Sequence, residues 1–128
     1  MNRFTDNQDG TIFDSHTNLL WLKDANHFKT SMLWKEAVDA CKTLEISGGG
    51  WRLPEVKELL SLVDYSRYNP ALPQGHPFSN VQSSYYWSAT TDAYNIYYAW
   101  VVYMYNGSVD YGYKADDYNG YVWPVRDV

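Results

Sequence analysis

Residues that catalyse reactions or bind metals are few in this sequence, and their spacing does not suit either task. The three histidines, His16, His27 and His76, lack the spacing of metal ligands, and no serine occupies a nucleophile elbow. The single cysteine, Cys41, falls on the apolar stripe of an expected helix, so we expect a buried and unreactive thiol. The sequence therefore disfavours an enzyme, and we expect no catalytic residue, no metal site and no cofactor.

Tyrosine is the residue type that stands out instead. The chain has 13 Tyr in 128 residues, and nine of them lie within 94–121. No Lys or Arg occurs between Arg67 and Lys114. Tyrosines supply a large contact area at low entropic cost, and neighbouring Ser, Gly, Asn and Asp adapt their hydrogen bonds. This composition indicates a ligand-binding surface, because a core would have to provide a partner for each buried hydroxyl. Packing of the tyrosines against a neighbouring loop or subunit is the alternative.

An expected hairpin over residues 98–113 divides these side chains between two faces, because a strand alternates its sides. We expect Trp100, Val102 and Met104 to face the core, joined by Val109 across the turn. The other face is expected to be exposed and to carry Ala99, Val101, Tyr103, Tyr105, Ser108, Asp110, Tyr111 and Tyr113. With the neighbouring loops, the predicted ligand-binding residues are Tyr94, Asn95, Tyr97, Tyr98, Val101, Tyr103, Tyr105, Ser108, Asp110, Tyr111, Tyr113, Asp116, Asp117 and Tyr118.

The elements that position these residues can be predicted from local patterns. Periodic apolar residues predict a helix over 32–44, capped by Thr30 or Ser31. A second helix is expected after Trp51, with Pro54 at its first position. The expected strands are 11–13, 19–22, 86–90, 98–105, 108–113 and 121–126, with an irregular stretch over 64–80. The pattern predicts one α+β domain spanning residues 1–128.

Composition limits the classes of partner. The net charge of −5 argues against binding to nucleic acids or anionic membranes. No apolar run approaches the roughly 20 residues that span a bilayer, so we expect no membrane insertion. The N-terminus has no apolar signal core, so nothing in this chain is expected to direct secretion.

A series of short motifs extends over nearly the whole chain. They are Asp9-Gly10-Thr11, residues 17–21, Trp34-Lys35-Glu36-Ala37 with Cys41, residues 51–59 (WRLPEVKEL), residues 86–90 (YWSAT), Ala99-Trp100, Gly107 and residues 122–126. Together they resemble the C-terminal domain family of bacterial collagen-like adhesins. The resemblance implies a C-type lectin-like fold, with two helices packed on small antiparallel sheets. It also implies a possible homotrimer and a location on a cell surface or phage particle.

Two departures limit what the resemblance implies. The fold is related to that of the formylglycine-generating enzymes, whose paired cysteines this chain lacks. Trp123 stands where the family more often has Arg, which puts in doubt any role of a cation at that position.

Members of this fold also serve as variable proteins of diversity-generating retroelements, in which template adenines are mutated. A template Asn codon can become Tyr, Asp, Ser, Gly, Ala, Ile or Val, but not Lys, Glu, Gln, Met or Trp. All residues at positions 94–98, 101, 103, 105, 106, 108, 110–113 and 115–119 are reachable in this way. We therefore expect a variable protein that displays a diversified region at about 94–119 to a protein or glycan on another cell or particle. The alternative is a fixed adhesin module that binds glycans or glycosaminoglycans, although this region lacks the basic residues that a polyanion needs.

Overall fold

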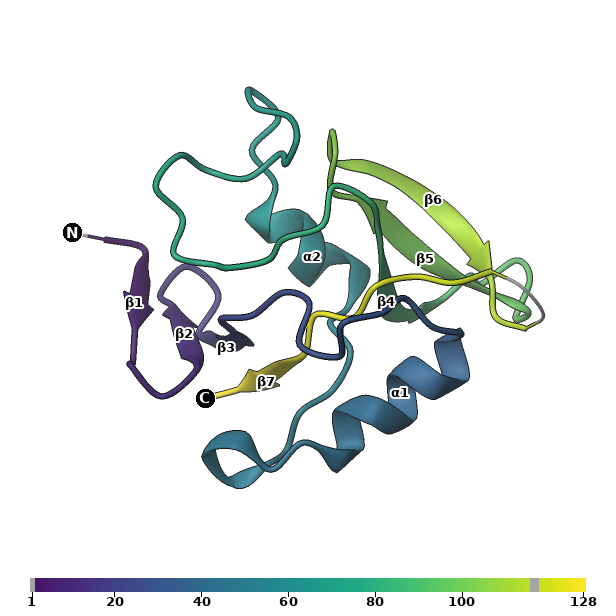
Figure 1. Cartoon of the computed structure of the whole chain (residues 1–128). Helices are drawn as coiled ribbons and strands as arrows, with labels where there is room; N and C mark the ends of the chain where they lie inside the picture. Colours follow the sequence, from purple (N-terminus) through teal and green to yellow (C-terminus); the bar gives the residue numbers. More distant parts are fainter. Residues whose placement is uncertain (1, 116–117) are drawn as a thin grey trace.

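The computed structural model describes residues 2–115 and 118–128, and it contains two helices and two small antiparallel sheets (Figure 1). The predicted α+β class is thereby confirmed, whereas the C-type lectin-like fold stays a prediction. Neither helix in the described part of the chain has the length and apolar character needed to cross a membrane.

The first sheet joins the two ends of the chain. Its strands are β1 (Phe4–Asp6), β2 (Thr11–Asp14), β3 (Leu19–Leu22) and β7 (Val125–Asp127), in the order β1-β2-β3-β7. The strands predicted at 11–13 and 19–22 are confirmed. The last predicted strand is shorter than expected, because Pro124 precedes β7 and its carbonyl accepts the Leu22 N–H at 3.1 Å. This sheet closes one end of the molecule.

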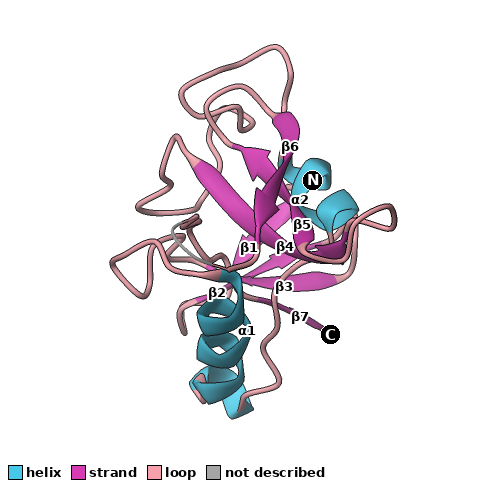
Figure 2. Ribbon diagram, turned by 90° about the vertical axis from the view of Figure 1, so that its right-hand side faces the viewer, coloured by secondary structure: helices cyan, strands magenta, loops and turns pink. Residues whose placement is uncertain are grey.

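The two helices begin later than the sequence predicts. Helix α1 (Trp34–Thr43) is preceded by Leu33, whose N–H donates to Glu36 Oε1 at 2.9 Å, so neither Thr30 nor Ser31 is the cap. Helix α2 (Val56–Leu62) is preceded by Glu55, so Pro54 lies before the cap and not at the first helical position. A 3₁₀ turn (Ile46–Gly48) separates them. In Figure 2, α1 extends below the strands and α2 lies beside the second sheet.

The second sheet carries half of the predicted binding residues. Its strands are β4 (Tyr85–Thr91), β5 (Tyr98–Tyr103) and β6 (Ser108–Tyr113), in the order β4-β5-β6. The hairpin turn lies at Asn106-Gly107, as predicted, and Gly107 N–H donates to Tyr103 O at 2.7 Å. Strand β5 is therefore central, while β4 and β6 are the outer strands.

Both faces of β5 contact buried residues. The face with Ala99, Val101 and Tyr103, here called the Val101 face, packs through Val101 in a cluster that includes Cys41 of α1. The opposite face, with Tyr98, Trp100 and Val102, is called the Val102 face, and Val102 packs in a cluster with Leu59 of α2. The two helices thus cover opposite sides of the same central strand.

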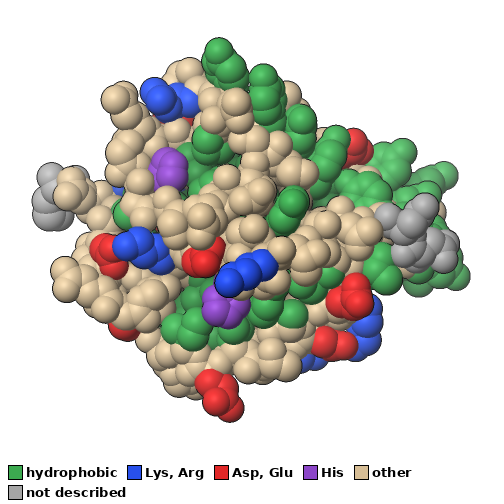
Figure 3. All heavy atoms as spheres, in the orientation of Figure 1, with side chains coloured by type: hydrophobic (Ala, Val, Ile, Leu, Met, Phe, Trp, Pro, Cys, Tyr) green, Lys and Arg blue, Asp and Glu red, His purple; other side chains and the backbone are tan. Residues whose placement is uncertain are grey.

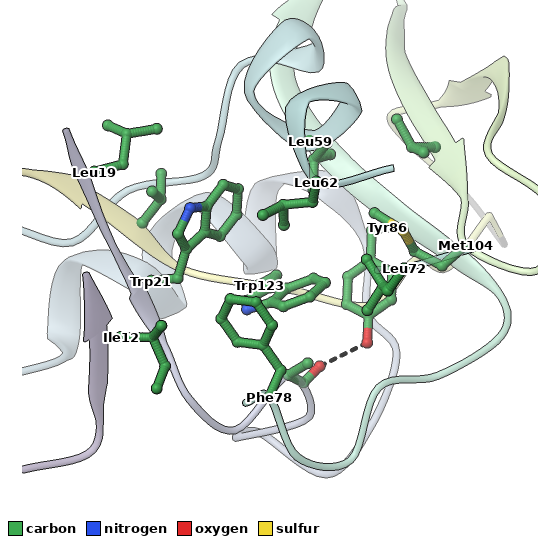
Figure 4. Close-up of a cluster of buried hydrophobic side chains, with 13 residues drawn as sticks. Ile12, Leu19, Trp21, Leu59, Leu62, Leu72, Phe78, Tyr86, Met104 and Trp123 are labelled. Atoms are coloured by element: carbon green, nitrogen blue, oxygen red, sulfur yellow. Dashed lines mark hydrogen bonds between the residues drawn. The ribbon is translucent and has the colours of Figure 1, made fainter. Parts of the chain in front are cut away.

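Trp123 lies at the centre of the larger cluster (Figure 4). It makes edge-to-face contacts with Trp21 and Phe78 at centroid distances of 5.4 and 4.9 Å. Its indole N–H donates to Leu22 O at 3.0 Å. Nearby, the buried Tyr86 hydroxyl donates to Ala25 O at 2.7 Å, the bond drawn in Figure 4. Trp123 is thus a core residue with its polar atom satisfied.

Candidate ligand-binding surface

The prediction that Val101 belongs to an exposed surface was wrong. Val101 and Ala99 are 0% exposed and pack in the cluster that contains Trp87. The physical reason is the position of β5 between two outer strands, with helices packed against both sides. An alternating pattern predicts a buried and an exposed face only where one side of the strand meets solvent.

The prediction also placed Tyr111 and Tyr113 on the wrong face. In the register of the hairpin, Tyr111 is opposite Trp100 and Tyr113 is opposite Tyr98, and opposite residues of an antiparallel pair share a face. Both tyrosines therefore lie on the Val102 face. This face is core on β5 at Val102 and surface on the outer strand β6, where Val109, directly opposite Val102 and expected in the core, is 43% exposed.

Several exposed aromatic residues lie where the β4–β5 loop meets the ends of β5 and β6, whereas Tyr65 and Tyr68, which are 69% and 72% exposed, lie in the loop that follows α2. We call this group the tyrosine tip and define it as Tyr94, Ile96, Tyr97, Tyr98, Trp100, Tyr111 and Tyr113. Tyr94, Tyr97 and Tyr111 are 96%, 64% and 52% exposed. Hydrophobic side chains, tyrosines included, gather at the right-hand end of the molecule in Figure 3, where Figure 1 places these elements.

Ring contacts link the tip residues that lie on the sheet. Tyr98 contacts Tyr111 and Tyr113 edge-to-face, with centroids 4.9 and 5.5 Å apart. Trp100 contacts Tyr111 in the same geometry at 6.3 Å. Such pairs are favoured by the aromatic quadrupole. The rings therefore support one another.

The loop part of the tip is ordered by short side-chain-to-backbone bonds. Asp92 Oδ1 accepts the Tyr94 N–H at 2.9 Å, and Asn95 Oδ1 accepts the Tyr97 N–H at 3.0 Å. These are the Asx turns that Asp and Asn favour. The backbone bond from Lys114 N to Tyr97 O, at 2.9 Å, joins the loop to the end of β6. The Oδ1 atom of Asn95, a predicted ligand-binding residue, thus helps to position the loop.

A second aromatic group, the tyrosine row, includes Tyr85 and Tyr103 on the Val101 face of the second sheet. It comprises Tyr118, Tyr85, Tyr103, Tyr105 and Tyr68. Tyr85 stacks on Tyr103 at 4.6 Å, and Tyr103 stacks on Tyr105 at 5.8 Å. Tyr118 and Tyr68 extend the row at its ends, at 6.3 and 6.0 Å. Tyr85 and Tyr68 are not among the predicted binding residues. Tyr85 could have been found by pairing β4 with β5, whereas no local signal marks Tyr68.

Tyr118 contributes to packing more than the prediction assumed. Its ring lies 5.4 Å from that of Trp87, and a Cβ at Gly112 would come within 2.5 Å of its Cε1 atom. Burial raises the pKa of its hydroxyl to about 12, helped by nearby Tyr85 and Asp110. Tyr118 therefore covers Gly112 and Trp87, so it is not a free binding residue.

The remaining predicted residues fall into two groups. Ser108 and Asp110 are exposed on β6. The Ser108 N–H donates to Asn106 Oδ1 at 3.0 Å, and the Asp110 carboxylate accepts the Tyr111 N–H at 2.8 Å. The predicted residues Asp116 and Asp117 lie outside the described part of the chain.

One lysine lies close to these aromatic groups. Lys114 Nζ is 4.3 Å from the ring centroid of Trp34 and donates to Thr91 Oγ1 at 2.8 Å. Partial burial lowers its pKa. The ammonium group is thus already held by an indole face and a hydroxyl.

The residues described form neither a cluster of metal ligands nor a site with an activated thiol. Within 2–115 and 118–128, no group of three or more His, Cys, Asp and Glu could hold a metal ion. Cys41 is buried, as predicted, and burial raises the pKa of its thiol to about 12. A thiol with such a pKa is protonated at neutral pH and is a weak nucleophile.

The motif at residues 51–54 serves the scaffold. Arg52 forms two bonds to the Glu58 carboxylate, at 2.8 and 3.0 Å, and one to Asp127 Oδ1 at 3.2 Å. Backbone bonds between Arg52 and Val125, 2.9 Å in both directions, join the same segments. Arg52 therefore ties α2 to the last strand, far from the tyrosine tip.

Comparison with known proteins identifies the family of the chain. No curated protein matches the chain. A family model described as Lcl C-terminal domain matches residues 10–126, which include both sheets except β1 and the last residue of β7. Apart from Asp9, the match includes all of the motifs from which the resemblance was inferred. The chain therefore belongs to the Lcl C-terminal domain family.

Proposed function

We propose that this chain is a non-enzymatic ligand-binding domain and that the tyrosine tip is its main contact surface. The observation that carries the proposal is the exposure of several aromatic rings on an ordered loop and strand end. Soluble proteins rarely leave such groups exposed without a partner. Tyrosine and tryptophan are also enriched in protein interfaces because they offer contact area with few rotatable bonds.

We further propose that the region is diversified, as in the variable proteins of diversity-generating retroelements. Among the described positions 94–98, 101, 103, 105, 106, 108, 110–113, 115, 118 and 119, all except Val101 and Gly112 are exposed or half-buried, but Ala99, Val102 and Gly107, which an Asn codon also reaches, are buried as well. Residues out of reach of that codon, such as Trp100, Met104 and Trp123, are buried or half-buried. A diversified site needs this division, because side chains must change without loss of the fold.

The DNA around the coding sequence tests this second proposal. We expect a reverse transcriptase gene nearby and an imperfect repeat of codons 94–119 that differs mainly at adenines. Without both features, the alternative of a fixed adhesin domain, which membership of the Lcl family favours, would replace the variable-protein proposal.

Removal of the tip rings tests the main proposal. Tyr94, Tyr97, Tyr111 and Tyr113 are each replaced by Ala in one variant. Because these side chains are exposed, we expect the free energy of unfolding in urea to fall by less than about 2 kcal/mol. The control is Tyr86→Ala, which removes a fully buried ring and is expected to cost about 4 kcal/mol. If the fourfold variant loses as much as the control, the rings are core and the proposed contact surface does not exist.

A further inference from the structure

The two outer strands of the second sheet differ in what lies along their free edges. Other segments bond to the edge of β4, through Tyr121 N–H to Tyr85 O at 2.8 Å, Trp87 N–H to Tyr121 O at 3.0 Å and Ala89 N–H to Pro54 O at 2.7 Å. No described segment pairs with the outer edge of β6, and five of its six residues are exposed. Figure 1 shows β6 at the margin of the molecule. The edge of β6 is therefore open to another chain.

The register of the hairpin shows which backbone groups of β6 are free. Lys114 N–H donates to Tyr97 O at 2.9 Å, so the pair that follows the end of β6 is a bonded one. Bonded and non-bonded pairs alternate along an antiparallel ladder. The residues whose N–H and C=O groups point away from β5 are therefore Val109, Tyr111 and Tyr113. The Tyr111 N–H agrees with this, because it donates at 2.8 Å to the carboxylate of Asp110, the preceding residue.

The side chains of the same three residues also lie together. Val109, Tyr111 and Tyr113 are opposite Val102, Trp100 and Tyr98, so they share the Val102 face. They are 43%, 52% and 38% exposed. On the other face of β6, Ser108 and Asp110 are exposed and polar. An added strand alternates its side chains in the same way, so it would meet apolar groups on one face and a carboxylate on the other.

We propose that β6 binds an extended peptide segment of a partner protein as a further strand of the sheet, an inference that rests on the proposed function. Main-chain bonds to a free sheet edge supply affinity in this mode of recognition, and contacts with alternate side chains supply specificity. The segment has apolar residues that contact Tyr111 and Tyr113, alternating with polar residues that are not acidic, because Asp110 repels a carboxylate opposite it. A second copy of the chain is a poorer occupant, because each copy carries a net charge of −5.

Asp110 competes with such a strand for one hydrogen bond. Its carboxylate accepts the Tyr111 N–H that a carbonyl of the added strand would otherwise accept. Natural sheets use charged residues to protect free edges in this manner. Removal of this carboxylate should therefore strengthen binding, whereas removal of an ordinary contact residue weakens it.

Titration and hydrogen exchange of the ¹⁵N-labelled protein test the inference by nuclear magnetic resonance. The probe is the peptide Thr-Val-Thr-Val-Thr, blocked at both ends. Its controls are the same peptide N-methylated at every residue, the peptide Asp-Val-Asp-Val-Asp and a neutral glucose oligosaccharide. In the free protein, the amides of Val109 and Tyr113 should exchange faster than that of Asp110, which faces β5. Saturation with the probe should slow both about tenfold, and the N-methylated and acidic peptides should bind at least fivefold more weakly.

Matched variants separate strand addition from other contacts at the tip. Val109→Pro removes an N–H that points away from β5, which an outer strand tolerates, and Val109→Ala is its control. We expect the proline variant to bind the probe about fivefold more weakly than the alanine variant. Asp110→Ala should bind about threefold more tightly than the wild type. Glu45→Ala, which removes the same charge at an exposed position outside the tip, should have little effect.

The outcomes distinguish this inference from the function on which it rests. Tip shifts without protection of Val109 and Tyr113, or tip shifts with the oligosaccharide alone, would overturn the added strand and leave a binding surface in place. Equal binding of the N-methylated or the acidic peptide, equal binding by the two Val109 variants, weaker binding by Asp110→Ala, or no shift with any probe would also overturn it. Protection that rises with protein concentration without peptide would make a second copy the occupant instead of a partner. The main proposal stands or falls separately with the stability of the fourfold tyrosine variant.

Discussion

Asp14 illustrates how single residues hold the N-terminal sheet together. Its side chain is fully buried and receives two bonds of 2.8 Å from Arg3 and one of 3.0 Å from the His16 N–H. Burial alone would raise the pKa of Asp14, but these bonds keep it below the ordinary value of 3.8. Because the folded-state pKa is the lower one, the stabilisation is complete above the unfolded-state pKa and is lost as the pH falls through the folded-state value.

We therefore expect the free energy of unfolding to decrease as the pH is lowered from about 5 to about 3. Asp14→Asn should make this decrease shallower, and Arg3→Ala should cost about 3 kcal/mol at pH 7 by leaving the buried carboxylate without its partner. Urea denaturation at several pH values measures both effects. Asp39→Asn, at an exposed helix position, is the control. A pH profile for Asp14→Asn that matches the wild type would contradict the assignment.

At the scale of elements, the β5–β6 turn depends on one glycine. Gly107 has φ of +84°, and a Cβ there would lie 2.5 Å from Val63 Cγ1 and 2.8 Å from Tyr65 Cε1. Tyr65 also donates its hydroxyl to Gly107 O at 3.1 Å. Gly107→Ala should therefore destabilise the protein by about 2 kcal/mol, from backbone strain and displaced neighbours.

Gly75 provides a matched control for this prediction, because it has a similar φ of +78° but no atom within 4 Å of the point that a Cβ would occupy. Gly75→Ala should show the backbone cost alone, about 1 kcal/mol. Thermal unfolding of the two variants measures the difference. Equal losses would mean that the contacts of Gly107 with Val63 and Tyr65 do not matter.

The elements that could be predicted are those set by neighbouring residues in the chain. The bounds of β6 follow from the Asn106-Gly107 turn signal, and the α1 stripe with Cys41 follows from helical spacing. The exposed or buried state of Val101 could not be predicted, since it depends on which strands and helices pack against β5. The tyrosine row could not be predicted as a unit either, because Tyr68, Tyr85 and Tyr105 come together only through pairing over long distances in sequence.

At the scale of the whole molecule, the scaffold and the candidate surface occupy different regions. The tryptophans at positions 21 and 123 and the ion pairs of Arg52 hold the region where the chain ends meet. The β4–β5 loop of the tyrosine tip lies at the end of the second sheet that is far from the first sheet (Figure 1), where hydrophobic side chains gather (Figure 3). The family motifs lie mainly in the scaffold, so membership of the family constrains the fold more than the ligand.

This separation predicts which positions of the region 94–119 tolerate change. Tyr94, Ile96, Tyr97 and Tyr111 are exposed, so substitutions there with residues that an Asn codon can reach should alter stability by about 0.5 kcal/mol or less. Val101 and Gly112 can be reached by the same codon but are buried, and a Cβ at Gly112 would lie 2.5 Å from Tyr118 Cε1.

A library that substitutes each position singly, displayed on cells and selected for resistance to protease, measures this tolerance. We expect Val101→Asp and Gly112→Tyr to be depleted, because the first buries an unpaired charge and the second forces the Tyr118 ring away from Trp87. Tyr94→Asp and Tyr97→Ser should persist at the frequency of silent variants. Depletion at the exposed positions to the same degree would show that the tip supports the fold, and the division between a constant scaffold and a changeable surface would be wrong.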